Sequence, residues 1–358
     1  MDKKLSNYLD IVRVIASFAV LFQHLSMYNN DVFAFFSNYG HPAVMAFFIL
    51  SGYVIAYVAD QREKNFNIYL KHRFARLYSV MVVAWLLTIL LDVVGPSINN
   101  QSYEGLIPTD NALVRILAHL FFLQQSWFVS IQFFSNQPLW SLAYEFWYYI
   151  LFGLLFLYKG KYKIPLIVVT VMIMGPIILV YGLIWFAGAY LYQLHKKKVT
   201  LNPTLASYVF LLTIPAIFSY PYWNQSVLPD VLPSLGTLSL RTYLDDIIFA
   251  TFILINIFFF RYSDLSFNLI TPLIRFLSGI SFALYVFHFP LMLFFKAIFE
   301  RYFDLSDELS FFIMSILIVI TVYLLSFVSE RKKRPYFHFF NYLENLIKRR
   351  FITFFKKV

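Results

Sequence analysis

Long apolar segments alternate with short polar ones along almost the whole chain of 358 residues. Each is close to the length of about 20 residues that an α-helix needs to cross the hydrocarbon core of a bilayer. A soluble domain does not repeat such segments, so the pattern predicts an all-α, polytopic membrane protein. The ten predicted crossings are Tyr8–Tyr28, His41–Val58, Leu77–Val94, Leu139–Tyr158, Ile164–Met174, Ile177–His195, Leu205–Tyr220, Thr242–Phe260, Ile274–Phe299 and Leu309–Val328.

The fifth and sixth crossings depend on how residues 164–195 are divided. As one helix this stretch would rise about 48 Å, which is too long for one crossing although short for two. Gly175-Pro176 supplies a turn signal in its middle. Lysines precede it at 159, 161 and 163 and follow it at 196–198, so the positive-inside rule assigns both flanks to the cytoplasm and favours an even number of crossings.

Composition and charge agree with this picture. Hydrophobic residues make up 60% of the chain and charged residues 13%, and the net charge is +10. With both termini assigned to the cytoplasm, most of the 29 Lys and Arg residues fall in cytoplasmic segments, so the charge is an orientation signal and not evidence for nucleic-acid binding. Cysteine is absent, which excludes disulfides, cysteine metal sites and a cysteine nucleophile. No metal site is predicted.

Two segments outside the predicted crossings have a character of their own. Residues 331–358 place aromatic and aliphatic side chains on one stripe among lysines and arginines. They predict a basic amphipathic cytoplasmic tail that lies on the inner leaflet, after a transmembrane domain of residues 1–330. Residues 95–138 form the longest segment between crossings and predict a cover over the outer mouth of the bundle. The first crossing is interpreted as a retained helix and not as a signal peptide.

Arg13 and His24 lie within the first apolar stretch, where an ionisable side chain is costly unless it has a function. Eleven residues turn an α-helix by about 1100°, within about 20° of three full turns, so both side chains share one face, with Asp10 near the same stripe. A neutral buried imidazole suits a general base, and Arg13 suits an anion. The alternative is that Arg13 snorkels to the interface and His24 is a hydrogen-bonded packing residue.

Arg73 and Arg76 are three residues apart in the segment that follows the second crossing. On a helix they would share a face at the cytoplasmic interface. Guanidinium groups bind phosphates bidentately, so the pair is a candidate site for a nucleotide-bearing ligand such as coenzyme A. The alternative is ordinary positive-inside anchoring.

Further polar residues occur inside the fourth and ninth crossings. Glu145 lies about two turns into the fourth, after Trp140 and Ser141, where an unpaired carboxylate is costly. His288 follows Tyr285 in the ninth, beside a proline that interrupts the backbone hydrogen bonds. We expect these side chains to line a site. Pairing of Glu145 for structural reasons, an interfacial role for Trp140 and a packing hydrogen bond for His288 are the alternatives.

Five motifs in this order resemble the integral-membrane acyltransferase family 3. They are the Arg13 to His24 spacing, Phe47-Phe-Ile-Leu-Ser51-Gly52-Tyr53, Arg73-Phe-Ala-Arg76-Leu-Tyr78, Trp140-Ser-Leu-Ala-Tyr-Glu145 and Ser281-Phe-Ala-Leu-Tyr285-Val-Phe-His288. The resemblance spans nearly the whole chain. It implies a membrane-bound O-acyltransferase, in most members an O-acetyltransferase, of the bacterial cytoplasmic membrane.

The resemblance also implies the substrates and the site. Acyl-CoA, usually acetyl-CoA, would be the donor, and a hydroxyl of a surface or lipid-linked polysaccharide the acceptor, with no permanently bound cofactor. Arg13, His24 and Glu145 would be catalytic, and Arg73 and Arg76 would bind coenzyme A. Another protein could receive the acyl group for onward transfer. The expected substrate-binding residues are Asp10, Trp140, Ser141, Tyr285 and His288.

A function of a different class fits the same polar residues. In a transporter, Arg13, His24, Glu145 and His288 would form a substrate or proton pathway across the bundle. The chain shows no internal duplication, and its arginines cluster toward the cytoplasmic side, which favours the enzyme.

Overall fold

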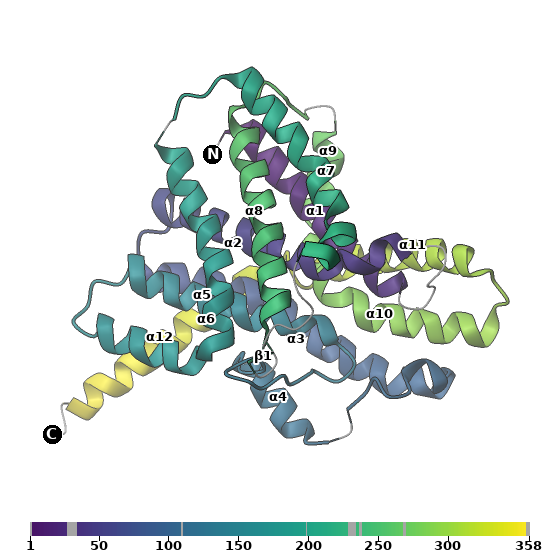
Figure 1. The fold of residues 1–358 in the computed structure, drawn as a ribbon. Helices are drawn as coiled ribbons and strands as arrows, with labels where there is room; N and C mark the ends of the chain where they lie inside the picture. The colour runs from purple at the N-terminus through teal and green to yellow at the C-terminus, as the bar shows by residue number, and fades with distance from the viewer. Residues whose placement is uncertain are drawn as a thin grey trace.

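The computed structural model is an all-α bundle (Figure 1). It describes residues 2–26, 34–108, 110–197, 199–227, 234–235, 238–267 and 270–355, with side chains described except at 34, 221–238 and 347–355. The elements are α1 (Lys3–Ser26), η1 (Ala34–Asn38), α2 (Gly40–Gln61), α3 (Phe66–Ile98), η2 (Gln101–Tyr103), α4 (Ala112–Leu120), η3 (Gln137–Trp140), α5 (Ser141–Phe156), α6 (Lys163–Lys196), α7 (Pro203–Val227), β1 (Ser234–Leu235), β2 (Leu238–Ser239), α8 (Leu240–Tyr262), α9 (Thr271–Ser278), α10 (Ser281–Tyr302), α11 (Asp307–Ser326) and α12 (Lys333–Phe355).

The predicted class is confirmed. Within the described part of the chain, nine helices are long and apolar enough to cross a membrane: α1, α2, α3, α5, α6, α7, α8, α10 and α11. The count is nine and not ten because residues 163–196 carry one label, α6, although the non-helical Gly175 separates two helical halves. Tyr28, the predicted end of the first crossing, lies outside the described residues.

The bend in α6 occurs where the sequence predicted a division. Gly175 has φ 73° and ψ 177°, a conformation that a residue with a Cβ rarely adopts, and Pro176 follows it. Lys163 donates to the Leu155 carbonyl near the end of α5, and Lys196 pairs with Asp60 at the end of α2. Both ends of α6 therefore lie at the end of the bundle where α2 and α5 end. The chain must turn back between them, and it does so at Gly175.

The predicted crossing Ile274–Phe299 is wrong in one respect, because the structure divides it. The short helix α9 ends at Ser278, and α10 begins at Ser281. The Arg275 side chain donates to Asn7 of α1, and the Ser278 hydroxyl donates to Asp10. These two contacts hold α9 against α1 and let α10 start beside the middle of α1.

Helices α2 and α6 pack with their backbones almost touching. A Cβ at Gly52 would lie 2.0 Å from the Trp185 carbonyl oxygen, and one at Gly188 would lie 2.2 Å from the Ile49 carbonyl oxygen. Small residues that let backbones approach are the usual way in which membrane helices associate. This contact fixes α2, which carries one wall of the polar interior.

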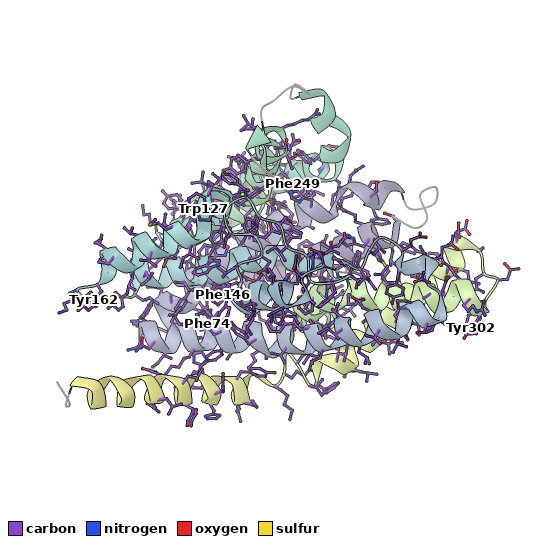
Figure 2. All side chains as sticks on the ribbon, turned by 90° about the horizontal axis from the view of Figure 1, so that it is seen from below. Phe74, Trp127, Phe146, Tyr162, Phe249 and Tyr302 are labelled. Carbon is purple, nitrogen blue, oxygen red and sulfur yellow. The ribbon has the colours of Figure 1, made fainter. Side chains whose placement is uncertain are left out.

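Lysines and arginines concentrate at one end of the bundle, where α1 and α3 begin and where α6 both begins and ends. We call it the basic end, and there Asp2 pairs with Arg261 and Asp60 with Lys196. There α12 lies along the first half of α3, where Lys71 pairs with Glu344 and Phe340 packs on Phe74 (Figure 2). The structure thus has a helix at the predicted tail, packed on the start of α3, which at 33 residues rises about 50 Å. The place of this tail on the inner leaflet stays a prediction.

Gly52→Ala should destabilise the protein, because its Cβ meets backbone that cannot rotate away. We expect the overpacking to cost about 1–3 kcal/mol and to lower both the thermal unfolding midpoint in detergent and the yield of monodisperse protein. The matched control is Gly182→Ala on α6, whose Cβ would meet nothing closer than 3.4 Å. Equal unfolding midpoints for the two variants would contradict the proposed role of Gly52.

Candidate active site

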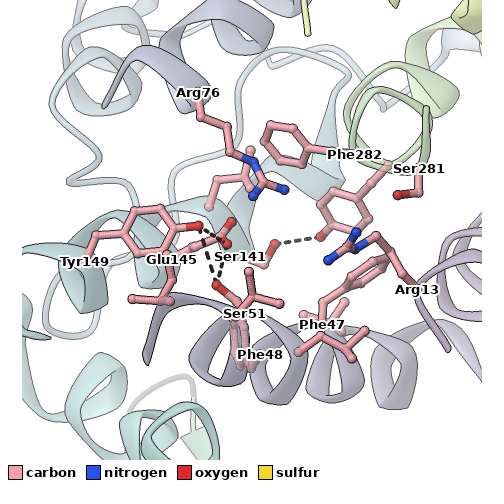
Figure 3. A pocket seen from close by; sticks show the side chains of 16 residues that line it. Arg13, Phe47, Phe48, Ser51, Arg76, Ser141, Glu145, Tyr149, Ser281 and Phe282 are labelled. Carbon is pink, nitrogen blue, oxygen red and sulfur yellow. Dashed lines mark hydrogen bonds between the residues drawn. The ribbon is translucent and has the colours of Figure 1, made fainter. Parts of the chain in front are cut away.

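Five helices surround a polar cavity inside the bundle (Figure 3). The space between its lining residues is about 660 Å³ when the open side and the narrow gaps between side chains are counted, and only a small part of it is wide enough for a water molecule. Polar side chains come from α1, α2, α3, α5 and α10, and apolar ones fill the gaps between them. The lining residues are Arg13, Val44, Phe47, Phe48, Leu50, Ser51, Val54, Ile55, Arg76, Ser141, Leu142, Glu145, Tyr149, Ser281, Phe282 and Tyr285.

Arg13 and Arg76 enter this cavity from opposite sides. Arg13 is anchored: Nη1 lies 3.1 Å from Asp10 Oδ1 and 3.3 Å from the Ser278 hydroxyl, which itself donates to Asp10 at 2.7 Å. Asp10 was predicted to bind substrate, and in the structure it orients Arg13. An arginine with one carboxylate partner and donors to spare can still bind an anion in the cavity.

Glu145 forms the opposite polar wall. Its Oε1 accepts hydrogen bonds from the Ser51 hydroxyl, at 2.7 Å, and from Tyr149 one turn further along α5. Two hydroxyl donors on one oxygen suit a carboxylate. The predicted pairing of Glu145 is thus found, and its partners Ser51 and Tyr149 were not among the residues predicted for the site.

Ser141 and Tyr285 join α5 to α10 beside the carboxylate. Their hydroxyls lie 2.7 Å apart, and the Tyr285 hydroxyl also lies 2.8 Å from the Pro138 carbonyl oxygen. Both were predicted to bind substrate, and both line the cavity. The bond fixes the start of α5 relative to α10.

The two arginines of the cytoplasmic motif have different surroundings. Arg73 is buried, its Nη2 lies 2.9 and 3.0 Å from the two Glu63 carboxylate oxygens, and it does not line the cavity. Arg76 lines the cavity with its guanidinium 5.5 Å from the Phe282 ring centroid, and this guanidinium makes no hydrogen bond or ion pair with any described residue. Although they are three residues apart on α3, only Arg76 remains available to a ligand.

His24 and His288 lie one contact beyond the cavity. Their ring centroids are 5.2 Å apart, and His288 is 6.3 Å from the Tyr285 ring that lines the cavity. His288 Nδ1 lies 2.9 Å from the Tyr285 carbonyl oxygen, so this nitrogen carries the proton and Nε2 is an acceptor. Within the described residues His24 Nδ1 and His288 Nε2 are buried without hydrogen-bond partners.

Trp140 does not line this cavity but a second one at the other end of the bundle, opposite the basic end. We call this second space the outer groove. Its lining residues are His41, His119, Gln125, Ser130, Ile131, Gln132, Gln137, Trp140, Tyr144, Ile177, Tyr181, Ser239 and Thr242. Six of them lie in the segment 95–138 that was predicted to cover the outer mouth.

Residues 6–331 match the model of the acyltransferase domain family to which the five motifs had pointed. The chain belongs to the acyltransferase 3 family. Because the match spans more than nine-tenths of the chain, it includes every residue that lines the polar cavity. The protein is therefore a polytopic membrane protein of an acyltransferase family, and its cavity is the candidate active site.

A relative of this acyltransferase is the Acyltransferase MdmB of Streptomyces mycarofaciens. The two are 33% identical over 131 residues, which is 35% of this chain and 30% of that protein. The match thus spans less than a third of the relative's length. No solved structure matches the chain. Among the described residues of the acyltransferase, no group of three or more His, Asp or Glu side chains is placed to hold a metal ion.

His119 on α4 should make the acyltransferase sensitive to acid. Burial lowers its pKa to about 4, below the value of about 6.5 expected in the unfolded chain, so the unfolded state binds more protons between these two values. Stability is therefore lost as pH falls below about 6.5. His119→Asn, which can still donate to the Arg115 carbonyl, should remove about 2 kcal/mol of the loss between pH 7 and 5.

The measurement is the thermal unfolding midpoint of the acyltransferase in detergent at both pH values. His338→Asn, on the exposed part of α12, is the control and should leave the pH dependence unchanged. A wild-type pH dependence in His119→Asn would show that this histidine does not contribute.

Proposed function

We propose that this acyltransferase moves an acetyl group from cytoplasmic acetyl-CoA to a hydroxyl of a surface or lipid-linked polysaccharide. The observation that carries the proposal is the convergence of Arg13, Arg76 and Glu145 on one internal cavity in a member of an acyltransferase family. The two guanidinium groups of this cavity suit the anionic part of a donor, and its apolar side chains suit the uncharged part.

The phosphates of coenzyme A would bind at the basic end of this cavity. Arg76 supplies an unpaired guanidinium, and Arg13 and Lys333 of α12 lie within electrostatic reach of it. Arg73, paired with Glu63, would position the start of α3 and not contact the donor. The pantetheine arm would then pass between Phe47 and Phe282, which line the cavity.

The acyl group would react beyond Tyr285, where the two histidines meet. His24 Nδ1 would take the proton of the acceptor hydroxyl as its oxygen bonds to the thioester carbonyl carbon. The carbon–sulfur bond then breaks, and the coenzyme A thiolate takes up a proton. A covalent route, in which His24 first carries the acyl group, uses the same nitrogen as nucleophile. Both routes need a neutral imidazole.

The membrane orientation follows from charge. The positive-inside rule puts the basic end in the cytoplasm, where acyl-CoA is made, and the outer groove on the far side. The acceptor would enter from that side, and a partner protein could carry the acyl group onward. The bacterial cytoplasmic membrane fits this arrangement.

Arg76→Ala should weaken acetyl-CoA binding, because a charge-assisted hydrogen bond is worth about 1.5–3 kcal/mol, or roughly 10- to 100-fold in affinity. The matched control is the double variant Glu63→Ala/Arg73→Ala, which removes the buried pair without leaving either charge alone. It should bind acetyl-CoA within about threefold of wild type. Calorimetry on the detergent-solubilised protein measures both, and the reverse ranking would refute the assignment of Arg76.

His24→Ala should abolish transfer of radiolabelled acetyl from acetyl-CoA to glycan acceptors by purified protein, with acetyl-CoA affinity retained. Label that stays on wild-type protein in the absence of acceptor would select the covalent route. Full transfer by His24→Ala at normal yield would overturn the role of His24. Absence of both binding and transfer in wild type would remove the proposed function, and flux across proteoliposomes would then test the transporter hypothesis.

A further inference from the structure

We propose that the outer groove is the acceptor site, that it takes an uncharged carbohydrate, and that His41 accepts a hydrogen bond from a hydroxyl of the sugar next to the one to be acylated. This inference rests on the proposed function and names the substrate class of its acceptor. The groove measures about 1190 Å³ when its open side is counted, and a sugar can enter from that side.

His41 is held as an oriented acceptor at the start of α2. Its Nε2 lies 2.9 Å from Asp246 Oδ2, and the Tyr181 hydroxyl donates to the same oxygen at 2.8 Å. Asp246 is 3% exposed, so it must remain paired, whereas the His41 side chain is 39% exposed into the groove. When Nε2–H donates to the Asp246 carboxylate, the other ring nitrogen, Nδ1, carries a free lone pair. Nδ1 makes no hydrogen bond to any described residue.

An aromatic platform adjoins this imidazole. The rings of His41 and Trp140 are stacked, with centroids 5.8 Å apart and 17° between their planes, and Tyr144 meets Trp140 edge-on. Ring faces carry negative charge density, which attracts the polarised C–H groups of a sugar ring. Trp140 thus offers an apolar surface beside groups that bind hydroxyls.

The remaining lining residues define the charge of the ligand. They are amides, hydroxyls, imidazoles and apolar side chains, and none of the described lining residues is Lys, Arg, Asp or Glu. Such groups both donate to and accept from hydroxyls but cannot compensate a phosphate or carboxylate. The groove therefore suits an uncharged polyol better than an acidic glycan.

The outer groove also adjoins the catalytic cavity. Trp140 precedes Ser141, which lines the cavity and contacts Tyr285. On the other side of His41, the Gly40 amide donates to Gln23, the residue before His24. The groove is thus linked to the cavity through two sequence neighbours, Trp140 before Ser141 on α5 and Gln23 before His24 on α1.

The absence of cysteine allows a direct test. Ser130→Cys introduces one exposed thiol in the outer groove, and Asp304→Cys introduces one on the exposed connection between α10 and α11. Intact cells producing each variant are treated with a membrane-impermeant maleimide. Acetyl transfer into envelope glycan and acetyl-CoA binding by the purified labelled protein are then measured.

Labelled Ser130→Cys should lose at least fivefold in transfer and keep its acetyl-CoA affinity, whereas labelled Asp304→Cys should keep both. Loss of transfer in Ser130→Cys before labelling, with donor binding kept, supports the proposal in the same way. Full transfer after complete labelling, or loss of acetyl-CoA binding together with transfer, would overturn it. Absence of transfer in the wild type would instead count against the proposed function.

The class of ligand and the role of His41 have separate readouts. The sugar that takes up label should be uncharged, and a carboxylate or phosphate on that sugar would overturn the assignment of class. Trp140→Ala should raise the acceptor KM at least tenfold with the acetyl-CoA KM unchanged, and Trp140→Phe should restore most of it. Asp246→Asn should lower kcat and alter the pH profile, because the His41 tautomer is no longer fixed. Unchanged acceptor kinetics in both Trp140→Ala and Asp246→Asn would refute the site.

Discussion

The fold depends on the cost of placing charge in hydrocarbon. A lone ionised side chain near the middle of a bilayer is destabilising by several kcal/mol, so such groups turn inward and seek partners. Arg13, Arg76 and Glu145 come from three different helices, and the bundle closes around the cavity that they share. The hydroxyls of Ser51 and Tyr149 solvate the carboxylate in place of water. The polar interior and the arrangement of the helices therefore both follow from the cost of charge in hydrocarbon.

The breaks in α6 and before α10 follow from the same constraint. Residues in a bilayer can leave helical geometry only where protein covers the freed backbone groups. At Gly175 the turn is covered by Trp127, whose amide and indole N–H donate to the Met174 and Met172 carbonyls. Before α10 the break releases Ser278, which joins the pair of Arg13 and Asp10. At each break protein groups cover the freed backbone, and the break before α10 also brings Ser278 to Arg13 and Asp10.

How much of this could be predicted from the sequence depends on the range of the interaction. Arg13 and Glu145 stand out because each is a charge inside an apolar run, and the turn at Gly175 is a local signal. The different surroundings of Arg73 and Arg76 could not be predicted, since helical spacing puts both on one face. Only the fold shows that Arg73 pairs with Glu63. His41 and Asp246 are 205 residues apart, and their pairing exists only after α2 and α8 pack. Asp246 within an apolar run was the local signal for that pair, although it could not identify the partner.

Helix α5 explains how donor and acceptor can meet without an open pore. Residues four apart on a helix share a face, and residues one apart diverge by about 100°. Trp140 and Tyr144 accordingly face the outer groove, whereas Ser141 and Glu145 face the inner cavity. The two spaces therefore share a wall that is one helix thick. A continuous aqueous channel would expose a thioester to hydrolysis, and the packed rings of Tyr285 and His288 beside this wall limit that access. If coenzyme A and a sugar bind as proposed, the bulk of each would remain at its own end of the bundle, and only the thioester and the acceptor hydroxyl would approach each other past the first turns of α5.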